Sequence, residues 1–110
     1  MVYLLSVDKR KPTYDLEAVK AVCGKVESLH VTGTALRGAA ALGLGRDEIA
    51  ETVQTMQRQH FYKSMTAYAN YRIWQDVYHV PSPIGLLYIK FTADAVTEFV
   101  LLSFKEKGDD

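Results

Sequence analysis

The spacing of apolar residues changes near the middle of the chain, from a helical repeat to alternation. In the first half, apolar residues recur every three or four positions, as on a helix with one face against a core. This pattern predicts helices over 14–23, 35–42 and 47–58. Between the first two helices, residues 28–32 alternate and are expected to form a short strand.

Residues at the ends of these segments fit helix boundaries. Thr13 or Asp15 can accept a hydrogen bond from the free amides that begin the first helix, and Gly24 is suited to end it. Thr34 is expected to cap the second helix, and Gly43 to end it. The first half of the chain is therefore expected to be helical.

From residue 60 onward, polar and apolar residues alternate, which is typical of strands whose two faces differ. Four strands are expected, over 61–68, 73–79, 86–92 and 98–105. Their short connections require successive strands to be antiparallel neighbours. Helices followed by strands predict an α+β fold, in which the N-terminal helices pack on one face of an antiparallel sheet.

The length of 110 residues suits one compact domain and is too short for two. We expect residues 1–110 to form a single domain, with 1–8 as an added edge strand or a frayed end. Neither end resembles a targeting signal, and no apolar run approaches the length of a membrane span. The sequence therefore predicts a cytoplasmic protein.

The 13 basic residues are balanced by 13 acidic ones, so the net charge is zero. Because phosphate binding usually leaves a basic excess, an RNA site in this chain must be a local cluster of basic side chains. The single cysteine, Cys23, excludes an internal disulfide and is expected to pack in the core. The three histidines lack zinc-site spacing, and no phosphate-binding loop is present, so neither a metal nor a cofactor is expected.

The expected strands do not separate cleanly into apolar and polar rows. In the first strand Lys63 lies between Phe61 and Met65, and in the second Gln75 interrupts a similar row. Burying such groups without partners costs about 1–3 kcal/mol each, so two neighbouring interruptions suggest a site. Alternatively, the opposite row, with Tyr78, faces the core, and Lys63 and Gln75 lie at the surface. That row carries Asp76, so the pattern leaves both choices open.

The last two strands have clearer rows. The third is expected to place Leu87, Ile89 and Phe91 on one face, and the fourth Val100, Leu102 and Phe104. Tyr88 and Lys105 then fall on the more polar rows.

Several segments closely resemble the MqsR (motility quorum-sensing regulator) family of toxins. They are FYKSMTAYANYRIWQDVY at 61–78, LLYIKFT at 86–92 and VLLSFKEK at 100–107. More weakly, KRKPTYDLEAVKAV at 9–22 is similar to the basic lead-in and first helix of that family. The resemblance covers about 9–107, and the order and spacing of its motifs make it specific.

The resemblance implies a fold like the RelE and YoeB toxins, a microbial ribonuclease sheet with helices on one side. It also implies an mRNA interferase that cuts at short GC-containing sequences without a metal or the ribosome. The implied partner is an antitoxin with a zinc-binding domain that contacts the toxin and a helix-turn-helix domain that binds DNA. Carried over to this chain, the active-site residues are Lys63, Gln75, Tyr88 and Lys105.

In a metal-free reaction the ribose 2′-OH attacks the adjacent phosphorus, which needs a base, an acid and charge stabilisation. Lys63 and Lys105 suit phosphate stabilisation and proton transfer, Tyr88 suits proton or hydrogen-bond donation, and Gln75 suits orientation of the reacting groups.

Further contacts with RNA are expected from cations and aromatic rings beside these positions. Lys90 and Arg72 are candidates for phosphate binding, and Trp74, Tyr78 or His79 for stacking on unpaired bases. Two other functions fit a small α+β domain. One is a non-catalytic module that pairs an open sheet edge with a partner protein. The other is a small-molecule sensor with a closed apolar pocket.

Overall fold

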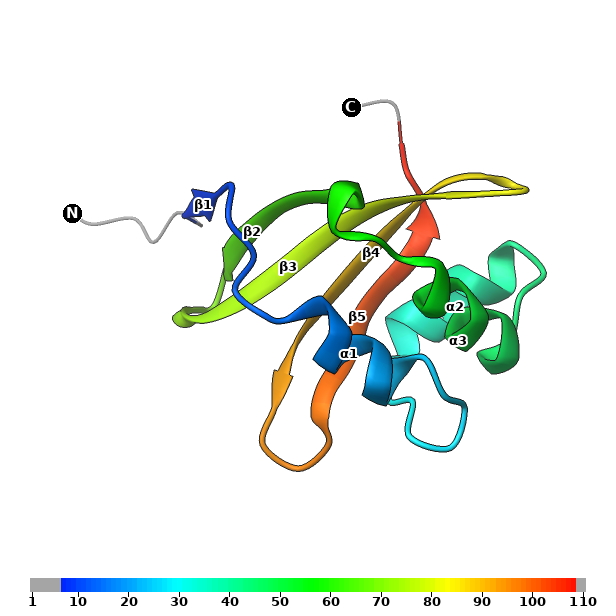
Figure 1. Cartoon of the computed structure of the whole chain (residues 1–110), viewed down its shortest axis with the longest axis horizontal. Coiled ribbons are helices and arrows are strands. Elements are labelled where there is room, and N and C mark those ends of the chain that lie inside the picture. The colour runs from blue at the N-terminus through cyan, green and yellow to red at the C-terminus, as the bar shows by residue number, and fades with distance from the viewer. Residues whose placement is uncertain (1–6, 109–110) are drawn as a thin grey trace.

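The computed structural model describes residues 7–108 (Figure 1). The helices in this part of the chain are α1 (Leu16–Cys23), α2 (Gly33–Ala41) and α3 (Arg46–Thr55), followed by a 3₁₀ turn, η1 (Arg58–His60). The strands are β1 (Asp8–Lys9), β2 (Phe61–Ala67), β3 (Asn70–Ser82), β4 (Gly85–Asp94) and β5 (Glu98–Glu106). They form one antiparallel sheet in the order β1-β2-β3-β4-β5. The α+β class and the meander of four long strands are confirmed.

The N-terminal segment adds a short edge to this sheet. Asp8 and Lys9 pair with Met65 and Ser64 of β2. The amide of Thr66 also donates a hydrogen bond to the carbonyl oxygen of Val7, at 2.9 Å. The remainder of the N-terminal edge strand considered from the sequence, residues 1–6, lies outside the described residues.

The helix caps differ in part from those expected. Asp15 caps α1, where its carboxylate accepts a hydrogen bond from the amide of Glu17 at 3.3 Å, and Gly24 follows the helix as its C-cap. Thr32, not Thr34, caps α2, with its Oγ1 accepting from the amide of Ala35 at 3.1 Å. The predicted cap is wrong because α2 begins two residues earlier than the pattern indicated.

The third helix is shorter than predicted. It ends at Thr55, because Met56 has an extended backbone with ψ of 139°, and the chain then makes the turn η1 before β2. Within the described residues no helix combines the length and apolar character that crossing a bilayer requires.

The strand expected over 28–32 is wrong. The segment makes an isolated parallel bridge, Val31 to Leu101, beside β5. The amide of Thr32 donates a hydrogen bond to the carbonyl oxygen of Leu101 at 2.9 Å. The amide of Leu101 donates one to the carbonyl oxygen of His30, also at 2.9 Å. The backbone of β5 is thus hydrogen-bonded along this outer side.

Helix α2 packs beside the same strand. A Cβ atom at Gly38 would overlap the carbonyl oxygen of Phe104, so glycine permits this close approach. Together, α2 and the segment before it cover the outer edge of β5, which is one means by which proteins block edge-to-edge pairing. This edge is not the open edge that a strand-pairing interaction module requires.

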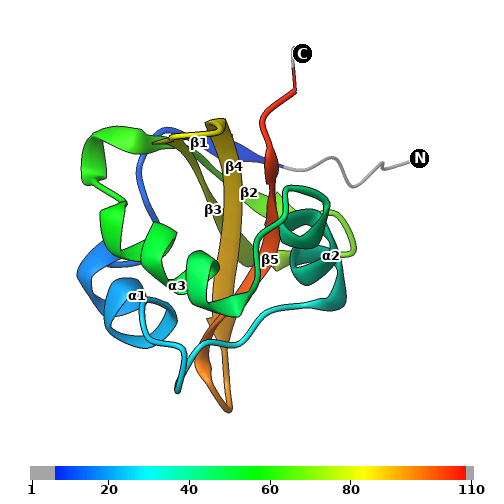
Figure 2. The ribbon, with the colours of Figure 1, turned by 90° about the vertical axis from the view of Figure 1, so that its right-hand side faces the viewer.

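Helices α1 and α3 cover one face of the sheet, with α2 beside β5 (Figure 2). Their apolar sides and the facing row of the sheet form one core, whose largest fully buried members from the sheet are Tyr78, Phe91, Phe104, Leu87, Ile89 and Leu101. The rings of Tyr78 and Phe91 stack with centroids 5.7 Å apart. The row with Tyr78 therefore faces the core, and the reading in which Lys63 and Gln75 interrupt core rows is wrong.

Asp76 lies on this buried row and has no exposed surface. Its carboxylate accepts hydrogen bonds from the amide of Thr13, at 3.1 Å to each oxygen, and from the amide of Tyr14 at 2.9 Å. A buried carboxylate requires such partners. Asp76 thus fastens the segment before α1 to the centre of β3.

The rows of β5 also depart from strict alternation. Lys90 of β4 pairs with Ser103, whereas the next residue, Phe91, pairs with Leu101, so Leu102 is left over at a bulge. Leu101 and Phe104 consequently both face the core, and the predicted grouping of Leu102 with Phe104 is wrong. A bulge of this kind reverses the faces of the residues that follow it.

Candidate active site

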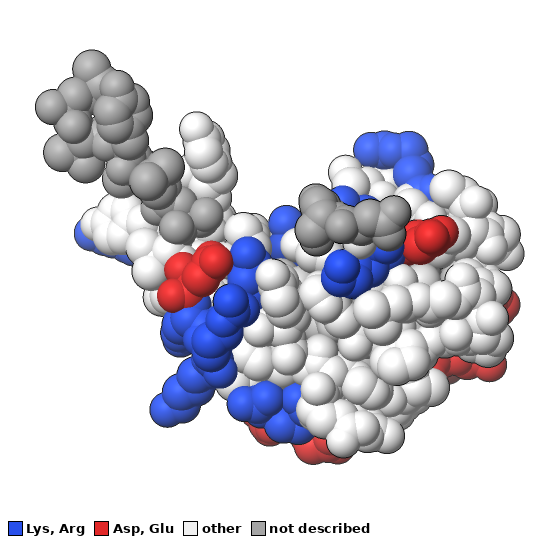
Figure 3. All heavy atoms as spheres, turned by 90° about the horizontal axis from the view of Figure 1, so that it is seen from above, with Lys and Arg blue, Asp and Glu red and all other residues white. Residues whose placement is uncertain are grey.

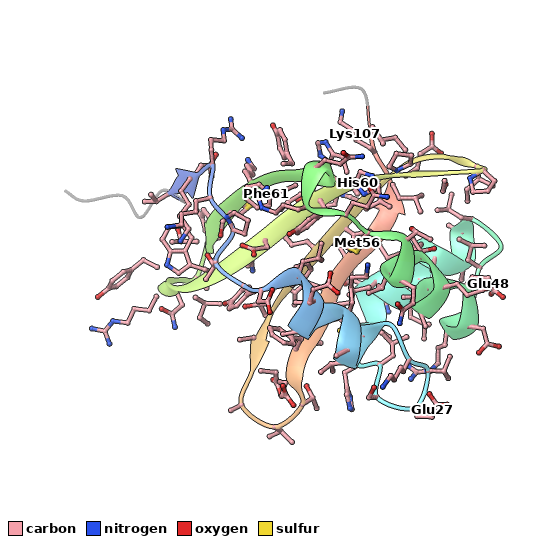
Figure 4. All side chains as sticks on the ribbon, in the orientation of Figure 1. Glu27, Glu48, Met56, His60, Phe61 and Lys107 are labelled. Carbon is pink, nitrogen blue, oxygen red and sulfur yellow. The ribbon has the colours of Figure 1, made fainter. Side chains whose placement is uncertain are left out.

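The face of the sheet opposite the helices carries a groove of about 720 Å³. The groove lies near the C-terminal end of β5, close to Lys107, which is labelled in Figure 4. Three cations and three aromatic rings line much of it: Lys63, Lys105, Lys107, Tyr62, His79 and Tyr88. The groove thus combines positive charge with flat apolar surfaces.

The strand register brings three of these side chains into one row. Tyr88 on β4 pairs with His79 on β3 and with Lys105 on β5. The ring centroids of His79 and Tyr88 are 6.0 Å apart, and the Lys105 Nζ lies 5.1 Å from the centre of the Tyr88 ring. Antiparallel pairing therefore fixes these three groups relative to one another.

A bulge at the start of β2 completes the cluster. Phe61 pairs with Tyr78 and Lys63 pairs with Val77, which leaves Tyr62 as an extra residue between them. The Tyr62 ring lies on the groove side and stacks on His79, with centroids 4.2 Å apart and planes 22° apart. The Lys63 Nζ lies 5.4 Å from the centre of the Tyr62 ring. The bulge thus places two neighbouring residues at the same groove.

Burial and neighbouring charges perturb several groups here. Burial lowers the pKa of His79 below its ordinary value of 6.5, and the positive charges of Lys107 and Lys63 lower it further. Burial raises the pKa of Tyr88, with a smaller contribution from Tyr62. Near neutral pH, His79 is therefore an uncharged imidazole, and Tyr88 keeps its proton.

Lys63 also forms an ion pair with β1. Its Nζ lies 3.2 Å from a carboxylate oxygen of Asp8, and their side chains are 22% and 42% exposed. The Asp8 carboxylate thus occupies one side of the Lys63 ammonium group. An incoming anion must compete with it for Lys63.

Figure 3 looks onto the molecule from above, where several groups of Lys and Arg atoms appear with few Asp and Glu atoms between them. In a chain of zero net charge, this is the local concentration of cations that an anionic ligand needs. Within residues 7–108, no three His, Cys, Asp or Glu side chains group closely enough to hold a metal ion.

The chain was compared with known protein families and curated proteins. The model of the family described as "Motility quorum-sensing regulator, toxin of MqsA" matches residues 11–106. The chain belongs to the MqsR toxin family. The protein named "mRNA interferase toxin MqsR" of Escherichia coli (strain K12) is 36% identical over 101 residues, which cover 92% of this chain and all of that relative. The resemblance identified in the sequence is confirmed.

Three of the four residues carried over from the MqsR resemblance, Lys63, Tyr88 and Lys105, line the groove. The fourth, Gln75, does not line it, although its strand neighbour Met65 does. Gln75 is half-buried and lies on the same side of the sheet, beyond Lys63 along the strands. The four groups therefore share one face, with Gln75 at the margin.

The candidate RNA-binding residues do not lie together on one surface. Lys90 is half-buried on the groove side, and its pKa is lowered by burial and by Lys105. Arg72 is exposed near the β2–β3 turn, and Trp74 lies on the opposite row with the Lys9 Nζ 4.2 Å from its ring centre. Tyr78 is fully buried beside core rings, so its predicted exposure for base stacking is wrong.

Sequence reasoning missed Tyr62 and Lys107 in the groove. Strict alternation places Tyr62 and Lys63 on opposite faces, and no residue in FYKSM marks the bulge that unites them. Lys107 follows the last expected strand, and although it ends the segment VLLSFKEK, the resemblance assigned no role to it. His79 was considered only as a stacking ring, because its central place depends on strand register.

Proposed function

We propose that this protein is an mRNA interferase toxin, an endoribonuclease that cuts single-stranded mRNA. The observation that carries the proposal is the groove in which Lys63, Tyr88 and Lys105 meet, in a chain of the MqsR toxin family. Paired lysines are suited to phosphate, and exposed aromatic rings are suited to unpaired bases. A groove on an open sheet face is accessible to a flexible single strand, whereas the closed apolar pocket of a sensor domain is not.

The proposed reaction is attack by a ribose 2′-OH on the neighbouring phosphorus. Lys63 and Lys105 stabilise the negative charge that develops on the phosphoryl oxygens, and one of them, once deprotonated, accepts the proton of the 2′-OH. Tyr88, whose pKa is raised by burial, remains protonated and donates to the leaving 5′-oxygen or to the phosphate. Because the attacking hydroxyl belongs to the same strand, the products are a 2′,3′-cyclic phosphate and a 5′-hydroxyl.

Residues along the open face extend the proposed path of the RNA. Gln75 orients the 2′-OH or a flanking phosphate. Lys90 lies between Gln75 and the groove, because Lys90 pairs with Val77, which in turn pairs with Lys63. Trp74 lies on the opposite row, so Trp74 and Arg72 contact the RNA only if it extends around the end of the sheet at the β2–β3 turn. No metal enters this mechanism, since every role has a protein side chain.

The finer features that the family implies are also part of the proposal. The 110 residues form a single domain of the RelE and YoeB ribonuclease type, which cuts at GC-containing sites in the cytoplasm. Its partner is an antitoxin with a zinc-binding domain and a helix-turn-helix domain. The description of the family as a toxin of MqsA supports a cognate antitoxin.

The test is cleavage of a defined single-stranded RNA by Lys63→Ala, Gln75→Ala, Tyr88→Phe and Lys105→Ala proteins. Loss of a group that acts in the transition state should lower the rate about 10²–10⁴-fold. Lys25→Ala, which removes an exposed lysine outside the groove, is the matched control and should cleave normally. RNA with a single 2′-deoxyribose at the cut should be resistant.

Thermal unfolding of each variant separates catalytic loss from loss of the fold. If all four substitutions leave the rate near that of the unaltered protein, the assignment of this groove is wrong. If the 2′-deoxy RNA is cut at the same bond, the proposed attack by the 2′-OH is wrong.

A further inference from the structure

His79 occupies the middle of the groove. One face of its imidazole stacks on the Tyr62 ring, and Tyr88 lies beside it with a centroid separation of 6.0 Å. It is partly buried, and its side chain has no hydrogen bond to another residue within the described part of the chain. An imidazole held between two rings, with its polar edge unengaged, is positioned to exchange a proton with a ligand.

The charged groups around the imidazole favour its neutral form. Each of the neighbouring strands contributes titratable side chains to the groove: Tyr62 and Lys63 from β2, Tyr88 from β4, and Lys105, Glu106 and Lys107 from β5 and its continuation. Three lysines line the groove with one carboxylate, that of Glu106, and a second carboxylate, Asp8 of β1, pairs with Lys63. Lys107 and Lys63 both lower the pKa of His79. Near neutral pH the ring is therefore in the form that acts as a base, and the imidazolium that would act as an acid is not the main form.

We propose that His79 is the general base of the cleavage reaction, accepting the proton of the attacking 2′-OH. This inference rests on the proposed function and adds a residue that the family resemblance does not supply. The imidazole of His79 is already deprotonated at neutral pH, whereas a lysine must first lose a proton before it can act as a base. The two lysines, Lys63 and Lys105, are then left to stabilise charge.

The step balances without any further reactant. The 2′-O–H proton passes to a ring nitrogen of His79 as the 2′-oxygen bonds to phosphorus, and the bond from phosphorus to the 5′-oxygen breaks. Tyr88 gives its proton to the departing 5′-oxygen. The imidazolium and the phenolate then exchange protons with water, which restores both groups.

The experiment measures the rate of cleavage of a defined RNA from about pH 5 to pH 8, the range in which histidine titrates. The unaltered protein should show a plateau at high pH and a fall below the pKa of His79, which lies under 6.5. His79→Gln, which cannot titrate, should lose this acidic limb and about 10²–10⁴-fold in rate. His30→Gln, an exposed histidine outside the groove, should leave both unchanged.

A second variant distinguishes proton transfer from packing. In His79→Ala, added imidazole should restore part of the rate, because a free base can enter the vacated space. If rescue is absent and the acidic limb persists in His79→Gln, His79 acts only as a stacked ring and the inference is wrong. If the unaltered protein cuts no RNA at any pH, the proposed function fails instead.

Discussion

The two faces of the sheet use the same four long strands for opposite purposes. The face under α1 and α3 is almost wholly apolar and closed to solvent, whereas the open face carries three lysines, an imidazole and two phenols around a groove. Because side chains alternate along a strand, consecutive residues contribute to one face or the other. Stability and proposed chemistry are therefore interleaved in sequence but separate in space.

Phe104 and Lys105 of β5 show this separation most directly. Phe104 is 1% exposed and belongs to the core, and Lys105 is exposed at the groove beside Tyr88. A change at either position should thus affect one property and spare the other.

The largest expected effect is that of Phe104→Ala. Removing a buried phenyl ring and leaving a cavity should lower the free energy of unfolding by about 3–5 kcal/mol. Lys105→Ala should change it by no more than about 0.5 kcal/mol while abolishing most RNA cleavage. Urea denaturation of both variants, followed by cleavage assays below their unfolding transitions, checks the comparison. A large loss of stability in Lys105→Ala would mean that the groove face also supports the fold.

Asp76 is a charged residue on the buried face, and it offers the second test. Asp76→Ala leaves the amides of Thr13 and Tyr14 without their acceptor, at a cost of about 1–3 kcal/mol. Hydrogen exchange should show faster exchange at these two amides than in the unaltered protein. Asp76→Asn keeps one carbonyl oxygen and should lose less. Equal losses in both variants would show that the negative charge, rather than the acceptor atoms, holds this segment.

The order of the helices and long strands followed from the sequence because it depends on local periodicity. Alternation from residue 60 onward predicted the meander, and the row Leu87, Ile89 and Phe91 lies in the core as expected. The choice of face for β3 was left open, since Asp76 looks out of place in an apolar row until its backbone donors are known. Those donors lie about sixty residues away in sequence, beyond any local pattern.

The groove was predictable only in part for the same reason. The MqsR motifs pointed to Lys63, Tyr88 and Lys105, which the structure brings to one groove. The bulge that adds Tyr62 depends on how β2 meets β3, and no local residue preference encodes it. A second bulge likewise changed the rows of β5.

The smallest expected effect concerns Asp8, which the edge strand β1 places against the groove. The family match begins at residue 11, after this strand. Asp8→Asn removes the charge that competes with RNA phosphate for Lys63 while keeping a side chain of similar shape. Because exposed ion pairs contribute about 0.2–1 kcal/mol, RNA should bind about 1.4- to fivefold more tightly. The measurement is the affinity for RNA that carries a 2′-deoxyribose at the cut, so that binding is observed without cleavage.

Salt and a matched variant sharpen this test. Asp47→Asn makes the same change in charge at an exposed position in the first turn of α3, outside the groove, and should leave the affinity nearly unchanged. The advantage of Asp8→Asn should shrink as the salt concentration rises, because screening weakens the competing ion pair. Weaker binding by Asp8→Asn would reverse the interpretation: the carboxylate would then hold Lys63 in place for the phosphate, and the edge strand would belong to the working part of the open face.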